Sequence, residues 1–499
     1  MTAHPSLWMA TSATTDLPPL PGDTRVEALV VGEGITGLTT ARLLAEQGVP
    51  VMVIDSGTIA AGTTGYTTAK LTALQSTIYR ELTGSWGEDV AAAYAGAQVE
   101  GLDTVRRLVT EDGIDCDLRT DAAYTYALTD EGLAKIEDEV SAGRGAGLAV
   151  DFTTNTDLPF PVRGAVKLEG QARFHPRKYC LGLMEAVVAR GGSMFEKTRA
   201  LDLDAADGVV HTDRGKITAD LIFVASHVPF VDTGLYLARM TPSRSYAVTF
   251  PSSPISGMYI SVEEPIRSIR STEDGHIVVG GESHPVGEGE DSRHHYEALV
   301  SWAGANFGAA EVDYRWSAQD YHHADGLPLA GPLGQSGRVF MATGFAKWGM
   351  TNGTVAAGVM VDLAMGRENP WADLFDTRRL ALKQGGGRLL KANARTVGNL
   401  VSKRILSTDL IDVSELESGS GAVVYLEGQK AAAYRDEHGM VHAVSPVCTH
   451  LGCQVEFNSA ETSWDCPCHG SRFDIEGRVL HGPATTDLER IQAPAVRAR

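Results

Sequence analysis

The segment that most constrains the fold is residues 26–55, VEALVVGEGITGLTTARLLAEQGVPVMVID. An apolar run leads into Gly32, Gly34 and Gly37, a helical pattern of apolar residues follows, and a second apolar run ends at Asp55. In a G-x-G-x-x-G fingerprint the glycines permit a tight turn, the approach of a pyrophosphate and close packing of helix on strand. The segment therefore predicts a parallel α/β unit that binds a dinucleotide at its helix N-terminus, with Asp55 accepting a hydrogen bond from a ribose hydroxyl.

The fingerprint alone does not distinguish FAD from NAD, but three later segments do. Residues 61–76 are rich in small and hydroxyl side chains, 211–227 contain a turn and an apolar strand, and 325–364 contain a strand followed by a glycine-rich turn and a helix. Together these segments resemble the FAD-dependent oxidoreductases of the D-amino-acid-oxidase and glycine-oxidase superfamily. No second fingerprint stands between a strand and a helix, which disfavours a pyridine-nucleotide reductase with two such sites.

The resemblance implies a Rossmann-like α/β FAD-binding domain interleaved with a mixed-sheet substrate domain, within residues 1–375. The FAD-binding pieces are expected at about 25–100, 160–240 and 325–375, and the substrate pieces at about 100–160 and 240–325. The loops 61–76 and 343–353 hold no Cys or His, so FAD is expected to be noncovalent. The residues implied to contact the cofactor are Gly32, Gly34, Ile35, Thr36, Gly37, Asp55, Ser56, Thr64, Thr68, Lys70, Gly344, Lys347, Trp348, Gly349, Met350 and Thr351. Lys347 has an alternative interpretation as a solvated loop lysine.

Near the end of the chain, residues 448–474 hold four of the six cysteines, in CTHLGC and CPCHGS. Two thiolates and two imidazoles at this spacing suit tetrahedral zinc or a Rieske [2Fe-2S] cluster. The loops, each closed by a glycine, resemble those of Rieske proteins. That resemblance implies two ligand pairs and one disulfide: Cys448 with Cys466 on one iron, His450 with His469 on the other, and Cys453 joined to Cys468. A zinc ribbon would leave the last two cysteines unexplained.

The surrounding residues 409–499 alternate short apolar strands with turns, which predicts a small antiparallel β domain. The resemblance places Ser471 where Rieske proteins donate a hydrogen bond to a bridging sulfide. Phe473 stands where high-potential members carry a tyrosine hydroxyl bonded to a ligand cysteine. Fewer hydrogen bonds to sulfur stabilise the reduced cluster less, so we expect a potential in the lower or middle part of the Rieske range.

Between the two regions, residues 376–408 are expected to form a basic linker helix. From 377 to 408 the chain has eight Lys and Arg and no acidic residue, with apolar residues at helical spacing. The helix could pack between the domains, or it could contact a membrane surface or a protein partner.

The net charge of −20 disfavours nucleic acid as a partner. The chain contains no run of about 18 apolar residues, so no membrane span is expected. Its first residues lack the pattern of a secretion signal, and we expect a cytoplasmic protein.

The residues expected near the reacting end of the flavin, as candidate catalytic or substrate-binding groups, are Arg173, His175, Arg244 and Tyr246, and Arg270 is a further candidate. An arginine there could bind a substrate carboxylate bidentately, or it could form an ordinary structural ion pair. Asp320, His322 and His323 precede the late glycine-rich segment, and adjacent histidines without a third ligand indicate a metal only weakly.

The whole arrangement resembles a bacterial family of FAD-dependent oxidoreductases with a Rieske domain. We expect a dehydrogenase that takes a hydride from a small molecule, such as an amine or amino acid, because an oxidase that returns electrons directly to oxygen has little use for a one-electron carrier in the same chain. The dehydrogenase would pass the electrons singly to its own cluster and then to an external acceptor protein. Two alternatives remain open: the cluster could supply the flavin with electrons for a reduction or hydroxylation, or the chain could be a non-catalytic electron-transfer module.

Overall fold

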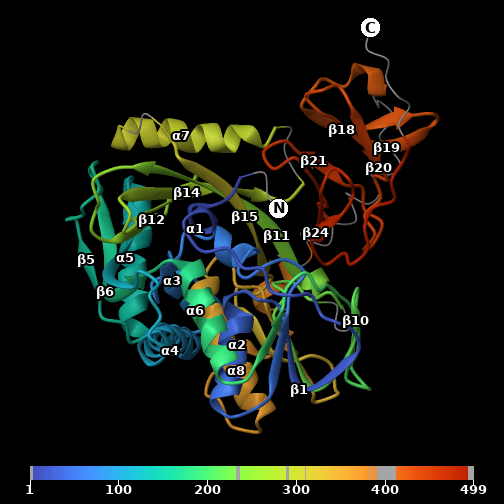
Figure 1. Cartoon of the computed structure of the whole chain (residues 1–499). Coiled ribbons are helices and arrows are strands. Elements are labelled where there is room, and N and C mark those ends of the chain that lie inside the picture. Colours follow the sequence, from blue (N-terminus) through green and yellow to red (C-terminus); the bar gives the residue numbers. More distant parts are fainter. Residues whose placement is uncertain are drawn as a thin grey trace.

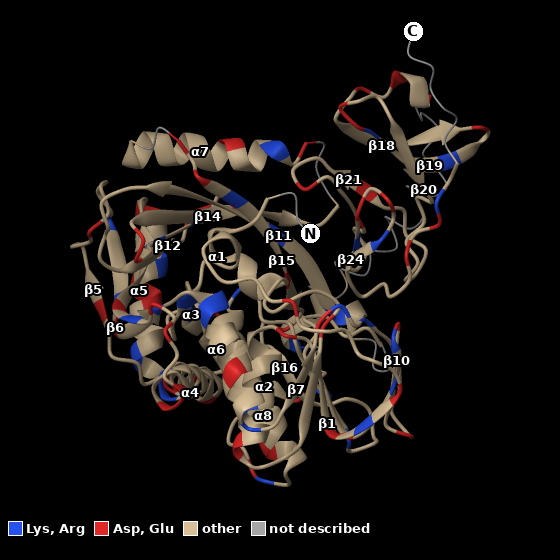
Figure 2. Cartoon of the chain, viewed as in Figure 1, with Lys and Arg blue, Asp and Glu red and all other residues tan. Residues whose placement is uncertain are grey.

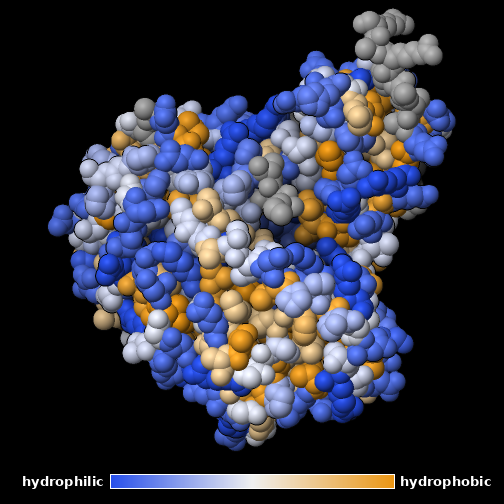
Figure 3. Space-filling model, viewed as in Figure 1, coloured by the Kyte–Doolittle hydropathy of each residue, from blue (hydrophilic) through white to orange (hydrophobic). Residues whose placement is uncertain are grey.

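The structure, a computed structural model, describes residues 4–231, 236–287, 291–308, 311–380, 383–387, 390 and 412–492. Two parts are distinct in Figure 1: a body made of residues 4–380, and a smaller C-terminal lobe made of residues 412–492. Acidic and basic residues are spread over both parts (Figure 2). The face seen in Figure 3 is largely hydrophilic, with hydrophobic residues scattered among the others.

The first sheet of the body contains the predicted dinucleotide unit. Its strands lie in the order β16-β17-β10-β1-β2-β7, and β10, β1, β2, β7 and β17 pair in parallel. β2 and β17 are buried along their whole length, as expected for parallel strands covered on both faces. The elements are β1 (Thr24–Val31), β2 (Val51–Ile54), β7 (Ser193–Phe195), β8 (Ala200–Asp204), β9 (Val209–Thr212), β10 (Gly215–Val224), β16 (Leu329–Pro332) and β17 (Val339–Thr343).

Three helices pack near this sheet: α2 (Ile35–Glu46), α6 (Pro176–Ala189) and α8 (Gly349–Ala364). α2 and α8 approach closely, because a Cβ on Gly353 would lie 2.4 Å from the Thr36 hydroxyl oxygen. The late glycine-rich segment therefore returns beside the fingerprint helix, as the resemblance implies.

The second sheet forms the predicted substrate side and runs in the order β15-β11-β14-β13-β12-β4-β6-β3, with β5 beside β6. Its strands are β3 (Lys70–Leu71), β4 (Arg119–Ala127), β5 (Val150–Thr153), β6 (Gly164–Arg173), β11 (Met240–Pro251), β12 (Met258–Ser261), β13 (Arg267–Ser271), β14 (His276–Pro285) and β15 (Tyr314–His323). β6 pairs with β4 along its length, so the chain returns to the FAD-binding side after residue 173 and not at about 160.

The remaining helices of the body are α1 (Leu7–Ala10), α3 (Ile78–Trp86), α4 (Glu88–Asp112), α5 (Asp130–Gly145), α7 (Arg293–Phe307) and α9 (Ala372–Phe375). α7 packs across β11 and β14 (Figure 1). Among the described residues, no helix is both long and apolar enough to cross a bilayer. Most of the predicted basic linker helix, residues 376–408, lies outside the described residues.

The C-terminal lobe is antiparallel, as predicted. One sheet joins β18 (Ser420–Leu426), β19 (Gln429–Arg435) and β20 (Val441–Val444), and the other joins β21 (Glu456–Asn458), β22 (Ser463–Asp465), β23 (Arg472–Phe473) and β24 (Val479–His481). Figure 1 shows β24 on the side of the lobe that faces the body. The two cysteine-rich loops lie between β20 and β21 and between β22 and β23.

Candidate active site and metal centre

A cavity of about 480 Å³ opens at the carboxyl ends of β1 and β2 and extends across the face of the second sheet. All of the predicted cofactor-contacting residues line it except Gly37, Gly344 and Thr351. Ligands of open α/β sheets bind at the carboxyl ends of the parallel strands, so the place of the cavity agrees with the fingerprint.

The glycines of the fingerprint are required by close backbone contacts. Gly32 has φ +119°, and a Cβ there would lie 2.5 Å from the carbonyl oxygen of Ala225. A Cβ on Gly37 would lie 1.9 Å from the carbonyl oxygen of Gly32. α2 begins at Ile35 without a side-chain cap from Gly34. The uncapped N-terminus of α2 and the glycine turn before it together form a site that fits a pyrophosphate.

Asp55 is held in place by two backbone amides. Its Oδ2 accepts from Glu33 N at 2.8 Å and its Oδ1 from Gly57 N at 2.7 Å. Burial raises the pKa of Asp55, and the two amide hydrogen bonds oppose that rise. The carboxylate is thus oriented at the end of β2, where each oxygen keeps a further lone pair for a ribose hydroxyl.

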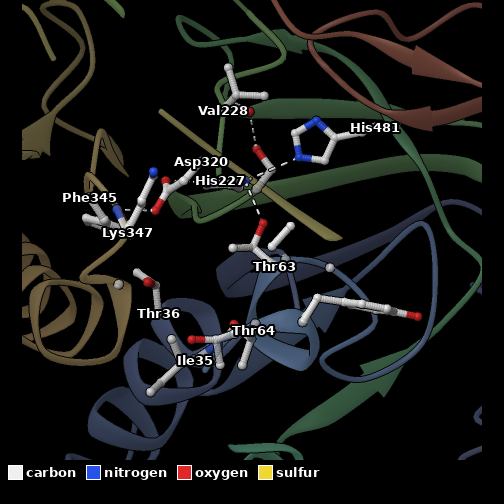
Figure 4. Close-up of a pocket in the computed structure, with 18 of the residues that line it drawn as sticks. Ile35, Thr36, Thr63, Thr64, His227, Val228, Asp320, Phe345, Lys347 and His481 are labelled. Carbon is white, nitrogen blue, oxygen red and sulfur yellow. Dashed lines mark hydrogen bonds and ion pairs between the residues drawn. The ribbon is translucent and has the colours of Figure 1, made fainter. Parts of the chain in front are cut away.

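His227 stands at the centre of a chain of polar contacts along one side of the cavity (Figure 4). Its Nε2 lies 2.9 Å from Asp320 Oδ1, and its Nδ1 lies 3.1 Å from the Thr63 hydroxyl and 3.3 Å from His481 Nε2. The Thr63 hydroxyl donates to the Gln319 carbonyl at 3.0 Å. Both ring nitrogens of His227 therefore lie within hydrogen-bonding distance of polar partners from three different segments of the chain.

The pKa values of two partners of His227 are shifted. Burial opposes ionisation of Asp320, but the hydrogen bond and charge of His227 keep the pKa of Asp320 below its usual value. Burial, together with the charge of His227, lowers the pKa of His481 to about 3. His481 is therefore neutral; its Nδ1 donates to the Gly482 carbonyl at 2.9 Å, and Nε2 accepts on the side of His227.

Two lysines face the same cavity. The Lys347 amide donates to Asp320 Oδ2 at 2.5 Å, and its Nζ is bonded to the Ser283 hydroxyl. The Lys347 side chain is exposed, but into a hollow surrounded by protein, and this desolvation lowers its pKa. Lys70 Nζ donates to the Tyr259 carbonyl, and burial, followed by the charge of Arg270, lowers the pKa of Lys70. Lys347 thus belongs to the cavity and not to a solvated loop.

The predicted substrate-binding residues are not brought together. Of the four, only Tyr246 lines the cavity, and its hydroxyl lies 3.0 Å from His284 Nε2. Arg173 and His175 line a separate cavity of about 220 Å³. Arg173 is paired with Asp121 at 3.0 Å, and His175 caps the N-terminus of α6.

Arg244, the fourth, points toward the C-terminal lobe. It is buried and lies 3.3 Å from Asp465 of the lobe. Arg270 is buried as well, and it donates to the carbonyls of Ala69 and Phe174 at 2.7 and 3.2 Å. Arg173 and Arg244 thus form structural ion pairs, which was the alternative interpretation, whereas Arg270 bonds to backbone carbonyls.

Sequence reasoning missed several lining residues, and some of them come from the C-terminal lobe. The lobe contributes Leu480, His481, Gly482, Ala484 and Thr485 to the cavity. No motif marks these residues, because their role depends on how the lobe docks on the body. His227 and Asp320, at the ends of β10 and β15, were also missed as cavity residues.

In the lobe, the two cysteine-rich loops have the same backbone design. Cys448 N donates to the Cys453 carbonyl and Cys466 N to the Ser471 carbonyl, each at 2.8 Å. Gly452 and Gly470 close the two turns with φ +76° and +78°. Each loop is therefore a five-residue turn that begins at a cysteine and contains a histidine, His450 in the first loop and His469 in the second.

The two loops bring Cys448, His450, Cys466 and His469 together. A hydrogen bond between the two thiol groups lowers the pKa of Cys448 to about 7 and raises that of Cys466. The rings of His450 and His469 lie 5.1 Å apart. Burial, with the charge of His450, lowers the pKa of His469 to about 4, and no partner for the buried His469 Nδ1 is found within the described residues. Thiolate and neutral imidazole are the forms that bind metal, and two free thiols, of which Cys448 ionises readily, beside two imidazoles make a donor set that fits a Rieske cluster.

A third thiol position is near, but it is not available as a ligand. The Sγ atoms of Cys453, Cys466 and Cys468 all lie within 4.8 Å of one another. Cys453 and Cys468 are joined by a disulfide with a Cα–Cα separation of 6.5 Å, as the resemblance implies. Cys448 and Cys466 remain as the free thiols between the loops.

Comparison with family models gives two matches. Residues 27–363 match the family described as FAD dependent oxidoreductase (DAO). Residues 407–492 match the Rieske [2Fe-2S] domain. The two matches lie on the body and on the lobe, in that order.

Individual relatives agree with the family matches. YhfW of Bacillus subtilis (strain 168), which its name describes as a Rieske 2Fe-2S iron-sulfur protein, is 36% identical over 96% of both chains. The gamma-glutamylputrescine oxidoreductase of Escherichia coli (strain K12) is 26% identical over 46% of this chain and 55% of its own length. The glycine oxidase of Geobacillus kaustophilus has a similar fold, with a TM-score of 0.62, 19% identity, and coverage of 71% of this chain and 99% of its own.

Proposed function

The chain belongs to the FAD dependent oxidoreductase family and carries a Rieske [2Fe-2S] domain, and from this premise we propose that it is a dehydrogenase with its own one-electron outlet. Its substrate is a small amine or amino acid. Two electrons leave the substrate as a hydride, and they leave the protein one at a time through the Rieske cluster to an external acceptor protein. The cofactors are FAD and one [2Fe-2S] cluster.

The observation that carries this proposal is the shared cavity. Five residues of the Rieske lobe line the same cavity as the dinucleotide fingerprint: Leu480, His481, Gly482, Ala484 and Thr485. A plain oxidase returns electrons from flavin to oxygen and has no use for a cluster beside the flavin. A cluster domain that forms part of the flavin cavity supports electron exchange within one molecule.

When bound, FAD accepts the hydride and the cluster carries single electrons; the chain supplies binding and orientation. The fingerprint turn holds the pyrophosphate, and Asp55 accepts from a ribose hydroxyl. The ligands proposed for the cluster are Cys448 and Cys466 on one iron and His450 and His469 on the other.

Small residues leave room for a substrate beside the second sheet. Ser245, Ala247, Ser268, Gly280 and Gly281 line this part of the cavity. The lining of the cavity does not include Arg173, Arg244 or Arg270. Bidentate binding of a substrate carboxylate by one of these arginines is therefore disfavoured. Lys347, whose Nζ is bonded to Ser283 of the second sheet, provides a point charge that suits either an amine with a distant acidic group or a small amino acid.

Anaerobic titration of the purified holoprotein tests the proposal. A panel of polyamines, N-alkylated amines and amino acids is added, the flavin absorption is followed, and the cluster is monitored by electron paramagnetic resonance. We expect at least one amine to bleach the flavin and then to produce the signal of a reduced Rieske cluster.

His469→Ala is the control, because it removes one proposed cluster ligand and leaves the flavin cavity intact. With this variant the same amine should bleach the flavin without producing the cluster signal. Bleaching of the flavin only by a reduced ferredoxin, and by no amine, would favour the reverse direction of electron flow and contradict the proposal.

A further inference from the structure

β15 lies between the flavin cavity and the second cluster loop of the Rieske lobe. Its even-numbered residues Trp316, Ala318, Asp320 and His322 all line the cavity. Its odd-numbered residues Ser317, Gln319 and Tyr321 all bond to the lobe. Successive side chains of a strand point to opposite faces, so one strand presents a different site on each side.

The contacts on the lobe side reach the second cluster loop directly. Gln319 Nε2 donates to the Gly470 carbonyl at 2.8 Å, and the Tyr321 hydroxyl donates to the His469 carbonyl at 3.0 Å. A Cβ on Gly470 would lie 2.4 Å from Gln319 Nε2 and 2.7 Å from the Tyr321 oxygen. Only glycine allows the loop to sit this close to β15.

Further contacts fix the orientation of the lobe. Arg244, on the neighbouring strand β11, lies 3.3 Å from Asp465, which also lies 3.1 Å from Arg472. At a second place Arg199 donates to the Val479 carbonyl at 2.8 Å. At a third place, α7 meets the lobe through Tyr296, whose hydroxyl donates to Glu461 at 2.8 Å.

We propose that β15 is the electron route between the two cofactors and that the lobe stays docked while the electron crosses. The route runs from the cavity side at Asp320, through the backbone to Tyr321, and across the Tyr321 hydroxyl to His469, a proposed ligand of the cluster. Tyr321 acts as a positioning residue, because it holds the carbonyl of that ligand against the strand.

The inference rests on the proposed function for the cofactors and for the direction of flow. In each crossing the bound flavin loses one electron and one ferric iron of the cluster becomes ferrous. An external one-electron acceptor protein reoxidises the cluster before the second crossing. The protons left by the two-electron oxidation go from the cavity to water.

Flash photoreduction of the full-length holoprotein tests the route without a substrate. A deazaflavin photodonor reduces the bound flavin anaerobically, and the decay of reduced flavin is compared with the appearance of reduced cluster. Tyr321→Phe keeps the ring and removes the hydrogen bond to His469. We expect electron transfer to slow severalfold in this variant, with FAD content and the resonance signal of the cluster unchanged.

Tyr79→Phe is the matched control, because the Tyr79 hydroxyl also donates to a buried backbone carbonyl, that of Ala73 at 2.6 Å, but away from the lobe. Its transfer rate should equal that of the unmodified protein. The rate in the unmodified protein should also be independent of added viscogen, since no domain has to move.

Equal transfer rates in Tyr321→Phe and Tyr79→Phe would overturn the route. A rate that falls in proportion to solvent viscosity would overturn the fixed docking. Absence of any transfer between flavin and cluster would overturn both this inference and the proposed electron outlet. A failed amine screen with intact flash-induced transfer would overturn the proposed substrate class alone and leave the route standing.

Discussion

At the scale of single residues, Glu33 is the most unusual group of the dinucleotide fingerprint. It is fully buried, and neither carboxylate oxygen has a partner within the described residues. Burial, with the nearby carboxylates of Asp55 and Glu196, raises the pKa of Glu33 to about 9. Glu33 is therefore protonated in the folded protein at neutral pH, whereas the unfolded chain releases that proton near pH 4.5.

This difference predicts a pH dependence of stability. Between about pH 4.5 and 9 the folded state holds a proton that the unfolded state has lost. The free energy of unfolding should fall by about 1.4 kcal/mol per pH unit in this window because of Glu33 alone. Glu33→Gln should remove that slope and make the protein more stable than the unmodified chain at pH 8. Denaturant unfolding from pH 5 to 9 measures the effect.

Glu139→Gln is the comparison for Glu33→Gln. Burial also raises the pKa of Glu139, to about 8, but its two oxygens accept from Tyr79 N and Arg80 N at 3.1 and 2.8 Å. An amide provides only one acceptor for those two donors, so Glu139→Gln should destabilise the protein. Parallel pH profiles for Glu33→Gln and the unmodified chain would show that Glu33 is ionised in the folded state.

Phe473 gives a second prediction at this scale, about the reduction potential of the cluster. The ring is fully buried in one cluster with Cys448 and Cys466. A hydroxyl added by Phe473→Tyr can donate to a ligand sulfur and stabilise the added electron. One hydrogen bond to a charged group is worth about 1.5–3 kcal/mol, which corresponds to a rise of about 60–130 mV for one electron. Protein-film voltammetry measures it.

Phe457→Tyr is the control for this substitution, since Phe457 is partly exposed in the same lobe and packs against Trp464 and Tyr434. Its potential should not change. An unchanged or lower potential in Phe473→Tyr would mean that the hydroxyl does not reach a sulfur.

At the scale of elements, the N-terminal segment with α1 holds the loop that lines the cavity. Ser6 bonds to the Gly65 carbonyl, and Trp8 Nε1 donates to the Thr67 carbonyl at 2.7 Å. Trp8 is buried in a cluster with Trp316 and with Ala69, the residue before Lys70. The segment therefore fixes the position of residues 61–70, which form part of the FAD site.

Trp8→Ala should accordingly weaken both folding and FAD binding. Removal of a buried tryptophan costs about 3–5 kcal/mol. The freed loop should release FAD more readily, which the fluorescence of dissociated flavin on dilution measures. Trp302→Ala, on α7, is the control: Trp302 packs against Phe160 and Phe307, away from the FAD site, and its loss should lower stability without releasing FAD. If Trp8→Ala retains as much FAD as Trp302→Ala, Trp8 does not hold the FAD-binding loop.

The elements also show what the sequence could and could not predict. The unit at residues 26–55 was predictable, because its strands, glycines and Asp55 follow one another in the chain and the contact of Gly37 with Gly32 is local. α1 was not, because a helix from Leu7 to Ala10 is too short to show a period. Arg244 lies beside Tyr246 in the sequence but faces the lobe, and only the position of the lobe reveals this.

At the scale of the whole molecule, buried charges cross the border between body and lobe. Arg244, Asp465 and Arg472 are each at least nine-tenths buried. Burial opposes ionisation of Asp465, but the charges of Arg472 and Arg244 hold its pKa at about 2. The carboxylate therefore compensates two guanidinium groups from different parts of the molecule.

Asp465→Asn should leave both guanidinium groups without compensation. Breaking a buried pair by removal of one partner costs about 3–5 kcal/mol. We expect a lower unfolding midpoint and faster proteolytic release of the lobe. Asp474→Asn is the control, since Asp474 accepts from backbone amides of its own turn, such as Glu476 N at 2.9 Å, and does not reach the body. Equal proteolysis of both variants would show that Asp465 does not hold the lobe.

The sharing of one polypeptide by lobe and body has a consequence for how strong their contact has to be. Single hydrogen bonds and an ion pair, as at Tyr321, Gln319 and Arg244, would give two separate proteins only a short-lived encounter. Covalent linkage makes the contact between lobe and body intramolecular, so it needs less intrinsic affinity than a contact between two separate proteins. Synthesis as one chain also fixes the ratio of the two cofactor sites at one to one. Every flavin therefore has its own cluster, and flavins of different molecules do not compete for a separate electron-transfer protein.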